Sequence, residues 1–288
     1  VGIITVLAGT LSTDSLGNTF SLTLMNGSTL KSHTAALAYN RPVTLGNGGG
    51  TIDLSNGPII LGGLVSGGGA LTIDSTNGGN SLELYNNNIY SGGTILNNGI
   101  LTVGSDTAAG TGTLTINGGE VRNMNAGATR TLANDLVLGG TFTMSGSGAL
   151  TFNGNVDLGG ANRIINRLIS ANLTFGGIVS NGDLTINSVS AGVVILAGPN
   201  SYTDTTINAG TLSVAAAANL GTGLLTLNGG ILSVTDATTL VNPFMIGSGH
   251  GTISNANDII LSGPITGPGN LTKTGAGKLT LAGLNSYN

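Results

Sequence analysis

The residue types that most often perform catalysis are few in this chain and lie far apart. Ten Asp and two Glu are spread from Asp14 to Asp258, and no two of them lie within four positions. General acid–base chemistry needs titratable groups held close together. Asp135 and Asp157 would stack if the chain coiled with a period equal to their spacing, but each also fits an ordinary turn. The pattern predicts no catalytic residues, so we do not expect an enzyme.

Metal and nucleophile chemistry finds equally little support in the residues. His33 and His250 are the two histidines, and neither has a second ligand at the spacing typical of metal sites. The chain has no cysteine, which excludes thiolate chemistry. No Gly-x-Ser-x-Gly segment follows a long apolar strand, as a serine nucleophile would require. We therefore expect no metal ligands, no cofactor and no cofactor-binding residues.

Five side chains are candidates for surface contacts with a partner. Arg163 and Arg167 are four residues apart, a spacing that would align them on one face of a helix. They form either a partner-binding patch or simply a solvated face. Tyr90, Tyr202 and Tyr287 each follow an Asn at the same distance. These tyrosines could project as contact residues, although their recurrence favours a structural role in a turn.

Composition points to an extended β-structure with a thin aliphatic core. Charged residues make up 7% and aromatic residues 3%, against roughly 25% charged in average domains. Apolar residues alternate with Thr or Ser, as in Leu71-Thr72-Ile73, which is strand patterning and argues against disorder. The net charge is −4 and the eight basic residues are scattered, so we expect no nucleic-acid partner. No apolar run is long enough to predict a membrane-spanning segment.

Internal repeats organise the chain into three related blocks, at approximately 60–172, 173–260 and 261–288. Similar strings occur at 84–90, 196–202 and 281–287, and the first spacing between them is clearly longer than the second. Within each block, short strands alternate with Asn-Gly, Gly-Gly and Ser-Gly pairs, which favour turns. The third block stops before its second half, so we expect 1–288 to be a single segment of a longer protein.

The repeat lengths favour a β-solenoid over an antiparallel sandwich. Asn-Gly between alternating strands is normally a hairpin signal, which keeps a meander or sandwich open as an alternative. However, the blocks differ in length by about 26 residues, close to one coil of a solenoid, which can gain or lose a coil because each coil contacts only its neighbours. We predict an all-β parallel β-helix of about 10–13 coils, with short helical turns at 107–109 and 215–220.

The last residues carry a resemblance to a known repeat. The stretch 268–288 contains Leu-Thr-Lys-Thr-Gly at 271–275 and ends in Asn-Ser-Tyr-Asn. It resembles the autotransporter-associated β-strand repeat, and Asn200-Ser-Tyr202 followed by 206–212 is similar to the second half of the same motif. In that family such repeats lie in secreted passengers folded as right-handed parallel β-helices. The resemblance therefore implies a right-handed β-helix and export from a bacterium.

Taken together, these features predict a non-catalytic passenger or stalk at the bacterial cell surface. Its function would be adhesion or cell–cell aggregation, and its partners would be further copies of itself, a host or abiotic surface, or glycans. A structural subunit of an extracellular fibre is the main alternative. A carbohydrate-active β-helix enzyme is a third, disfavoured by the sparse charges. All three alternatives place the protein outside the cell.

Overall fold

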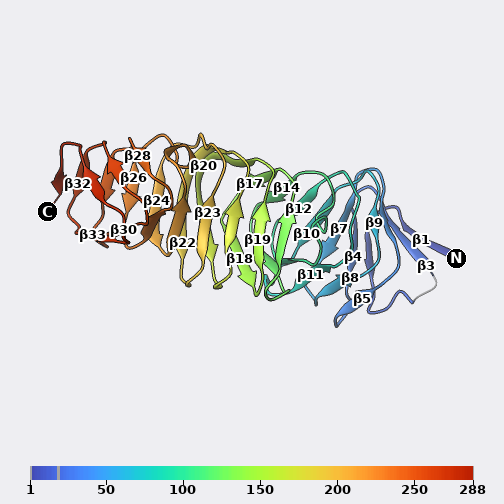
Figure 1. The fold of residues 1–288 in the computed structure, drawn as a ribbon. Helices are drawn as coiled ribbons and strands as arrows, with labels where there is room; N and C mark the ends of the chain where they lie inside the picture. Colours follow the sequence, from blue (N-terminus) through green and yellow to red (C-terminus); the bar gives the residue numbers. More distant parts are fainter. Residues whose placement is uncertain (1, 18–19, 288) are drawn as a thin grey trace. The chain divides into compact units, whose positions relative to one another are not determined.

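A computed structural model describes residues 2–17 and 20–287 of the chain (Figure 1). Asn288, the last residue of the stretch similar to the known repeat, lies outside the described residues. The chain divides into two compact units, Val1–Asn153 (unit 1) and Gly154–Asn288 (unit 2). The proposed single segment and its three block boundaries stay predictions.

Unit 1 consists of short strands joined by turns. Almost every strand alternates buried and more exposed residues, as the sequence pattern predicts for a strand with one face on a core. The strands of unit 1 are β1 (Gly2–Val6), β2 (Thr10–Ser12), β3 (Phe20–Leu24), β4 (Ser28–Lys31), β5 (Leu37–Tyr39), β6 (Val43–Leu45), β7 (Gly50–Asp53), β8 (Ile59–Leu61), β9 (Val65–Ser66), β10 (Leu71–Asp74), β11 (Ser81–Leu84), β12 (Thr94–Leu96), β13 (Ile100–Val103), β14 (Leu114–Ile116), β15 (Glu120–Asn123), β16 (Thr129–Leu132), β17 (Leu136–Leu138), β18 (Phe142–Gly146) and β19 (Ala149–Phe152).

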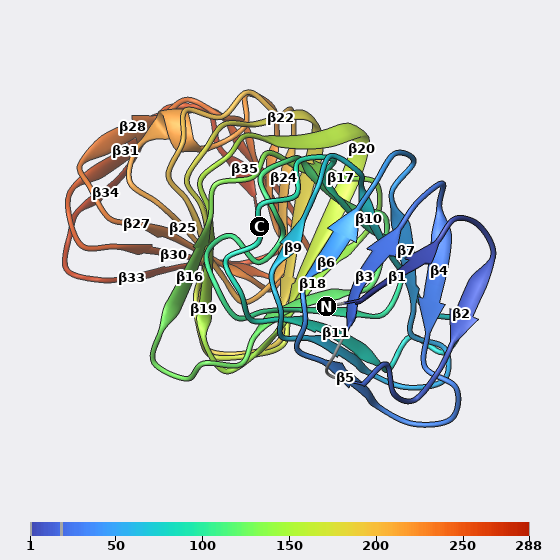
Figure 2. The ribbon, with the colours of Figure 1, turned by 90° about the vertical axis from the view of Figure 1, so that its right-hand side faces the viewer.

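The strands of unit 1 pair in parallel with the corresponding strand one coil away. The first row is β1-β3-β6-β9, the second row is β2-β4-β7-β10-β12-β14-β17, and the third row is β5-β8-β11-β13-β15-β18. Figure 2 shows the first row, with β1, β3, β6 and β9 side by side. A further parallel pair joins β16 and β19. Successive strands in the chain therefore belong to different rows, as in a solenoid.

Unit 2 has the same organisation and one short 3-10 helix, η1 (Ala217–Asn219). Its strands are β20 (Val156–Arg167), β21 (Leu173–Phe175), β22 (Val179–Ser188), β23 (Val193–Leu196), β24 (Thr205–Ala209), β25 (Thr211–Val214), β26 (Leu225–Leu227), β27 (Ile231–Val234), β28 (Thr238–Leu240), β29 (Phe244–Ile246), β30 (Gly251–Asn255), β31 (Ile259–Leu261), β32 (Ile265–Gly267), β33 (Leu271–Thr274), β34 (Leu279–Leu281) and β35 (Ser286–Tyr287).

Three parallel rows also build unit 2. They are β20-β22-β24-β26-β29-β32-β35, β21-β23-β25-β27-β30-β33 and β28-β31-β34. The last of these rows is labelled in Figure 2, where β28, β31 and β34 lie next to one another. The helical turn predicted at 215–220 is confirmed by η1. The one predicted at 107–109 is wrong as a helix, because the chain makes only a hydrogen-bonded turn there.

The all-β parallel solenoid predicted from the repeats is confirmed. Gly2 pairs with Phe20 in a short coil, Leu71 pairs with Thr94 in a longer one, and the chain makes about 14 turns. The expected number of coils was too low because the real coils are shorter than the coil length inferred from the difference between blocks. The right-handed sense of the coil stays a prediction.

Asn-Gly turns make corners here and not hairpins. Asn26 and Gly27 both have positive φ angles, 53° and 70°, as a tight hairpin turn would require. The turn is closed by the amide of Ser28, which donates to the carbonyl oxygen of Met25 at 2.9 Å. Yet the flanking strands β3 and β4 pair with strands of other coils and not with each other. The turn redirects the chain from the first row to the second.

The core of each unit is a stack of aliphatic side chains, one from each coil. In unit 1 one inward column, fully buried, consists of Leu30, Ile52, Ile73, Leu96, Ile116 and Leu138. In unit 2 a corresponding column consists of Ile186, Ile207, Leu227 and Ile246. Such a narrow core is filled by Leu, Ile and Val, which explains why the chain needs few aromatic residues.

Candidate functional site

Two of the three repeated tyrosines lie in the core. Tyr90 and Tyr202 are completely buried. The hydroxyl of Tyr90 lies 2.5 Å from Oγ1 of Thr94, and that of Tyr202 lies 3.0 Å from Oγ1 of Thr205. Proposing these two as surface contacts was therefore wrong, and the structural interpretation of the repeat was the better one. Tyr287 is partly exposed on β35, and a contact role for it stays a prediction.

A glycine of the following coil makes room for each buried ring. A Cβ atom at Gly110 would lie 2.8 Å from ring atoms of Tyr90, and one at Gly221 would lie 2.6 Å from the ring of Tyr202. Both contacts are closer than carbon atoms tolerate, so larger residues are excluded. Burial raises the pKa of both phenols, and that of Tyr202 rises to about 12. The two rings therefore stay neutral at any physiological pH.

The asparagine two residues before each tyrosine connects successive coils. The side-chain oxygen of Asn88 accepts the amide of Val65 at 2.9 Å, and its nitrogen donates to the carbonyl of Ala108 at 2.8 Å. Asn200 makes the same two kinds of bond, and Asn285 accepts an amide in the same way. The recurring Asn-x-Tyr motif is therefore a clamp between coils. The sequence showed the recurrence but not this role.

The arginine pair lies on a strand and not on a helix. Arg163 and Arg167 both belong to β20, which pairs in parallel with β22. Residues four apart on a strand share a face, and here that face points toward the interior. Arg163 is half-buried and donates from Nε to the carbonyl of Leu158 at 2.8 Å. The helical patch predicted from their spacing is wrong, although the partly exposed Arg163 keeps a contact role as a prediction.

Arg167 is fully buried and cannot serve as a surface contact. Its guanidinium donates to the carbonyl of Ala171 at 3.1 Å, to the carbonyl of Ser190 at 3.0 Å and to the hydroxyl of Ser190 at 3.2 Å. It also donates to the carbonyls of Ile169 and Gly192. Burial lowers the pKa of this guanidinium from its usual value. Arg167 thus ties together the turns that follow β20 and β22.

The residues considered as possible acids, bases or metal ligands accept hydrogen bonds from turns of the chain. Asp157 accepts the amide of Gly159 and the side-chain nitrogen of Asn181, both at 2.7 Å. His33 and His250 are exposed, and the ring Nδ1 of His250 accepts the amide of Asn270 at 3.0 Å. Within residues 2–17 and 20–287, no three His, Asp or Glu side chains gather at metal-binding distance. The helices of the described residues include none with the length and hydrophobicity that a membrane span requires.

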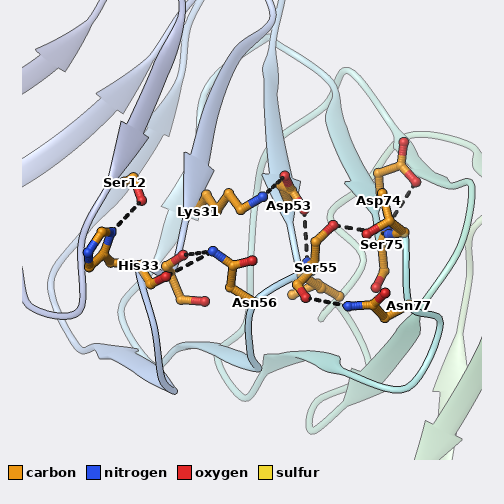
Figure 3. Close-up of polar contacts among 12 residues, drawn as sticks. Ser12, Lys31, His33, Asp53, Ser55, Asn56, Asp74, Ser75 and Asn77 are labelled. Carbon is orange, nitrogen blue, oxygen red and sulfur yellow. Dashed lines mark hydrogen bonds and ion pairs between the residues drawn. The ribbon is translucent and has the colours of Figure 1, made fainter.

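A charged and polar column follows the outer face of the second row in unit 1. Ser12, Lys31, Asp53 and Asp74 occupy successive coils at the same strand position. Figure 3 shows the ion pair between Lys31 Nζ and Asp53 Oδ2, which are 3.0 Å apart. Asn56 and Asn77 donate to the carbonyl oxygens of His33 and Ser55, each in the preceding coil. The outer wall is therefore a regular hydrogen-bonded surface.

Asp14 caps a turn in the next coil of unit 1 and gives a testable titration. Its carboxylate accepts the amides of His33 and Thr34 at 2.8 Å and the hydroxyl of Thr34 at 2.7 Å. The hydrogen bonds from Thr34, and further ones from the backbone of His33 and Ala35, lower the pKa of Asp14 from 3.8 to about 2.

Because the pKa of Asp14 is lower in the folded chain, its stabilising effect is complete above pH 3.8. That effect is lost as the pH falls through about 2. We expect the NMR signals of the Asp14 carboxyl and the Thr34 amide to titrate together with a midpoint near pH 2. Asp14→Asn should abolish the transition at Thr34. A carboxyl midpoint at the ordinary value would contradict the capping role.

A groove with a volume of about 310 Å³ lies on the third row of unit 1. Tyr85, Gly104 and Met124 follow the ends of β11, β13 and β15 in successive coils. Tyr85 and Met124 are each about half exposed. Asn125 and Arg130 also line the groove. The groove thus combines an aromatic ring, an apolar chain, an amide and a cation.

Charged residues concentrate around this groove. Glu83 on β11 accepts the hydroxyl of Tyr85 at 2.6 Å and pairs with Nη2 of Arg122 at 3.5 Å. Nη1 of Arg130 lies 3.9 Å from Asp106, whose side chain is mostly exposed. The groove was missed in the sequence because its lining residues are widely separated along the chain, from Tyr85 to Arg130. Only the pairing register brings them together.

Parts of this chain are similar to known proteins. The model of the passenger-associated transport repeat matches residues 190–214 and 271–288, which include Asn200-Ser-Tyr202 and Asn285-Ser-Tyr287. An adhesin autotransporter, BmaC of Brucella suis biovar 1, is 34% identical over 148 residues, which cover 45% of this chain and 4% of that protein. No solved structure was found to match. The chain is thus a parallel β-solenoid that carries passenger-associated transport repeats at 190–214 and 271–288 and has distant homology to an adhesin autotransporter.

Proposed function

We propose that the chain is part of a secreted, non-catalytic passenger that mediates adhesion or cell–cell aggregation at the bacterial surface. The observation that carries this proposal is the 34% identity to an adhesin autotransporter over 148 residues, in a chain that folds as a solenoid. The partners are a host or abiotic surface, or a second copy of the same protein. Because the match covers only 4% of that relative, the function of the complete protein is part of the proposal.

The outer walls of the solenoid suit such a role. Thr10, Thr29, Thr51 and Thr72 form a column on the second row of unit 1, beside the charged column described above. Adjacent hydroxyls in a column repeat at the spacing between strands, about 4.8 Å. A rigid, regular array of donors and acceptors can contact another surface through many weak hydrogen bonds. Its affinity then comes from multivalency and not from one deep pocket.

Deleting this segment in frame from the parent gene tests the proposal. We expect a several-fold reduction in attachment to surfaces or in cell clumping, with the rest of the protein still displayed. Immunodetection of the remaining protein on the cell surface is the necessary control. Unchanged attachment and clumping, with display intact, would rule out the adhesive role. Filaments that depend on the segment, without any effect on adhesion, would support a fibre subunit instead.

A further inference from the structure

In the groove on the third row, the ring of Tyr85 packs against Gly104 of the next coil. A Cβ atom at Gly104 would lie 2.4 Å from Cδ1 of Tyr85, so only glycine lets the ring lie down on the next coil. The hydroxyl of Tyr85 is held by Glu83, which is itself held by Arg122. The ring therefore has a fixed orientation although half of its surface is exposed. A rigid, half-exposed ring beside a groove is a preorganised contact surface for a ligand.

Arg130 supplies the charge of the groove. Its side chain is three-quarters buried, and its Nε atom has no hydrogen-bond partner among the described residues. The carboxylate of Asp106 is 3.9 Å from its Nη1 and also accepts the amide of Thr131 at 3.1 Å. The guanidinium lines the groove and its side chain is one-quarter exposed, and a planar guanidinium favours a carboxylate, which it can bind through two parallel hydrogen bonds.

The remaining lining fits a hydroxylated ligand. Asn125 is exposed at the groove and offers an amide donor and acceptor, and Met124 adds a flexible apolar contact. A volume of about 310 Å³ is at the lower end for small-molecule sites, enough for a short piece of a chain that continues along the wall. A sugar ring presents an apolar C–H face to an aromatic ring and hydroxyls at its edge.

We propose that this groove binds an acidic saccharide unit, of the uronic-acid kind, within a polysaccharide. The C–H face of the sugar stacks on Tyr85, its carboxylate pairs with Arg130, and a hydroxyl bonds to Asn125. This inference deepens the adhesive function proposed above and rests on it for its biological setting. It names a ligand class and a place on the solenoid for one of the contacts.

Titration calorimetry of the full chain with oligogalacturonate tests the groove directly. Uncharged oligogalactose of equal length serves as the comparison ligand. We expect measurable binding of the acidic oligomer and at least about tenfold weaker binding of the neutral one, because a charge-assisted hydrogen bond is lost. Tyr85→Ala and Arg130→Gln should each weaken acidic binding by about tenfold or more. Lys31→Gln, on the second row, is the matched control and should bind as the wild type does.

The outcomes separate this inference from the adhesive function. No binding of oligogalacturonate, or equal binding in wild type, Tyr85→Ala and Arg130→Gln, would overturn the groove proposal. Equal affinity for the acidic and neutral oligomers would overturn the role of Arg130. Circular dichroism spectra must match among the variants, and Asn125→Ala provides an independent test if one of them misfolds. Cells that still adhere with both groove variants leave adhesion intact and place it elsewhere on the solenoid.

Discussion

Tyr202→Ala is expected to lower the free energy of unfolding of unit 2 by about 3–5 kcal/mol. The ring is completely buried against Gly221, so its removal leaves a cavity that the neighbouring coils cannot fill. It also leaves the hydroxyl of Thr205 without its 3.0 Å partner. Denaturant unfolding gives the loss, and hydrogen exchange of β24 and β26 locates it, because repeat structures open locally.

Two variants make the Tyr202 result specific. Tyr202→Phe keeps the ring and removes only the hydroxyl, so we expect a loss of about 1 kcal/mol. Tyr85→Ala removes a ring that is half exposed in unit 1 and should cost clearly less than Tyr202→Ala. Equal effects of the two alanine variants would show that burial of Tyr202 does not hold the coils together. The tyrosine of the Asn-x-Tyr motif would then contribute no more stability than a half-exposed ring.

Arg167→Ala is expected to destabilise unit 2 by about 3 kcal/mol or more. The substitution removes every hydrogen bond made by a fully buried guanidinium and leaves carbonyl oxygens of two turns without donors. Each unsatisfied buried group costs about 1–3 kcal/mol. A guanidinium without a carboxylate partner is itself costly to bury, so part of this cost is returned when it is removed. Arg167→Met, which fills the space but makes no bonds, separates packing from hydrogen bonding.

Arg163→Ala is the matched control, since it is the same residue type four positions earlier on β20. Arg163 is half-buried and donates from Nε to the carbonyl of Leu158, so we expect a loss of about 1 kcal/mol. Thermal and denaturant unfolding of both variants measure the difference. If Arg163→Ala destabilised the unit as much as Arg167→Ala, the many hydrogen bonds from Arg167 to carbonyl oxygens would add no stability beyond that of a single such bond.

The sequence by itself determined the class of fold and the pattern of short strands and turns. Alternation such as Leu71-Thr72-Ile73 fixes strands with one apolar face, and this pattern is local, with a period of two residues. Repeats that differ by about one coil fit only an open stack, which selected the solenoid. The helical turn near Ala217 was also readable, because it depends on a short local run.

What only the tertiary structure decided is which residues of different coils meet. The length of a coil varies along the chain, because corners differ in length, and no local signal states that length. Tyr202 and Tyr85 are the same residue type, yet one is enclosed by the next coil and the other lies on the wall. Arg167 was assigned to a helix face because its spacing fits both periods, and the parallel pairing with Ser188 settled it as an inward strand residue. The groove beside Tyr85 exists for the same reason: the register between coils, not the order of residues along the chain, sets its lining.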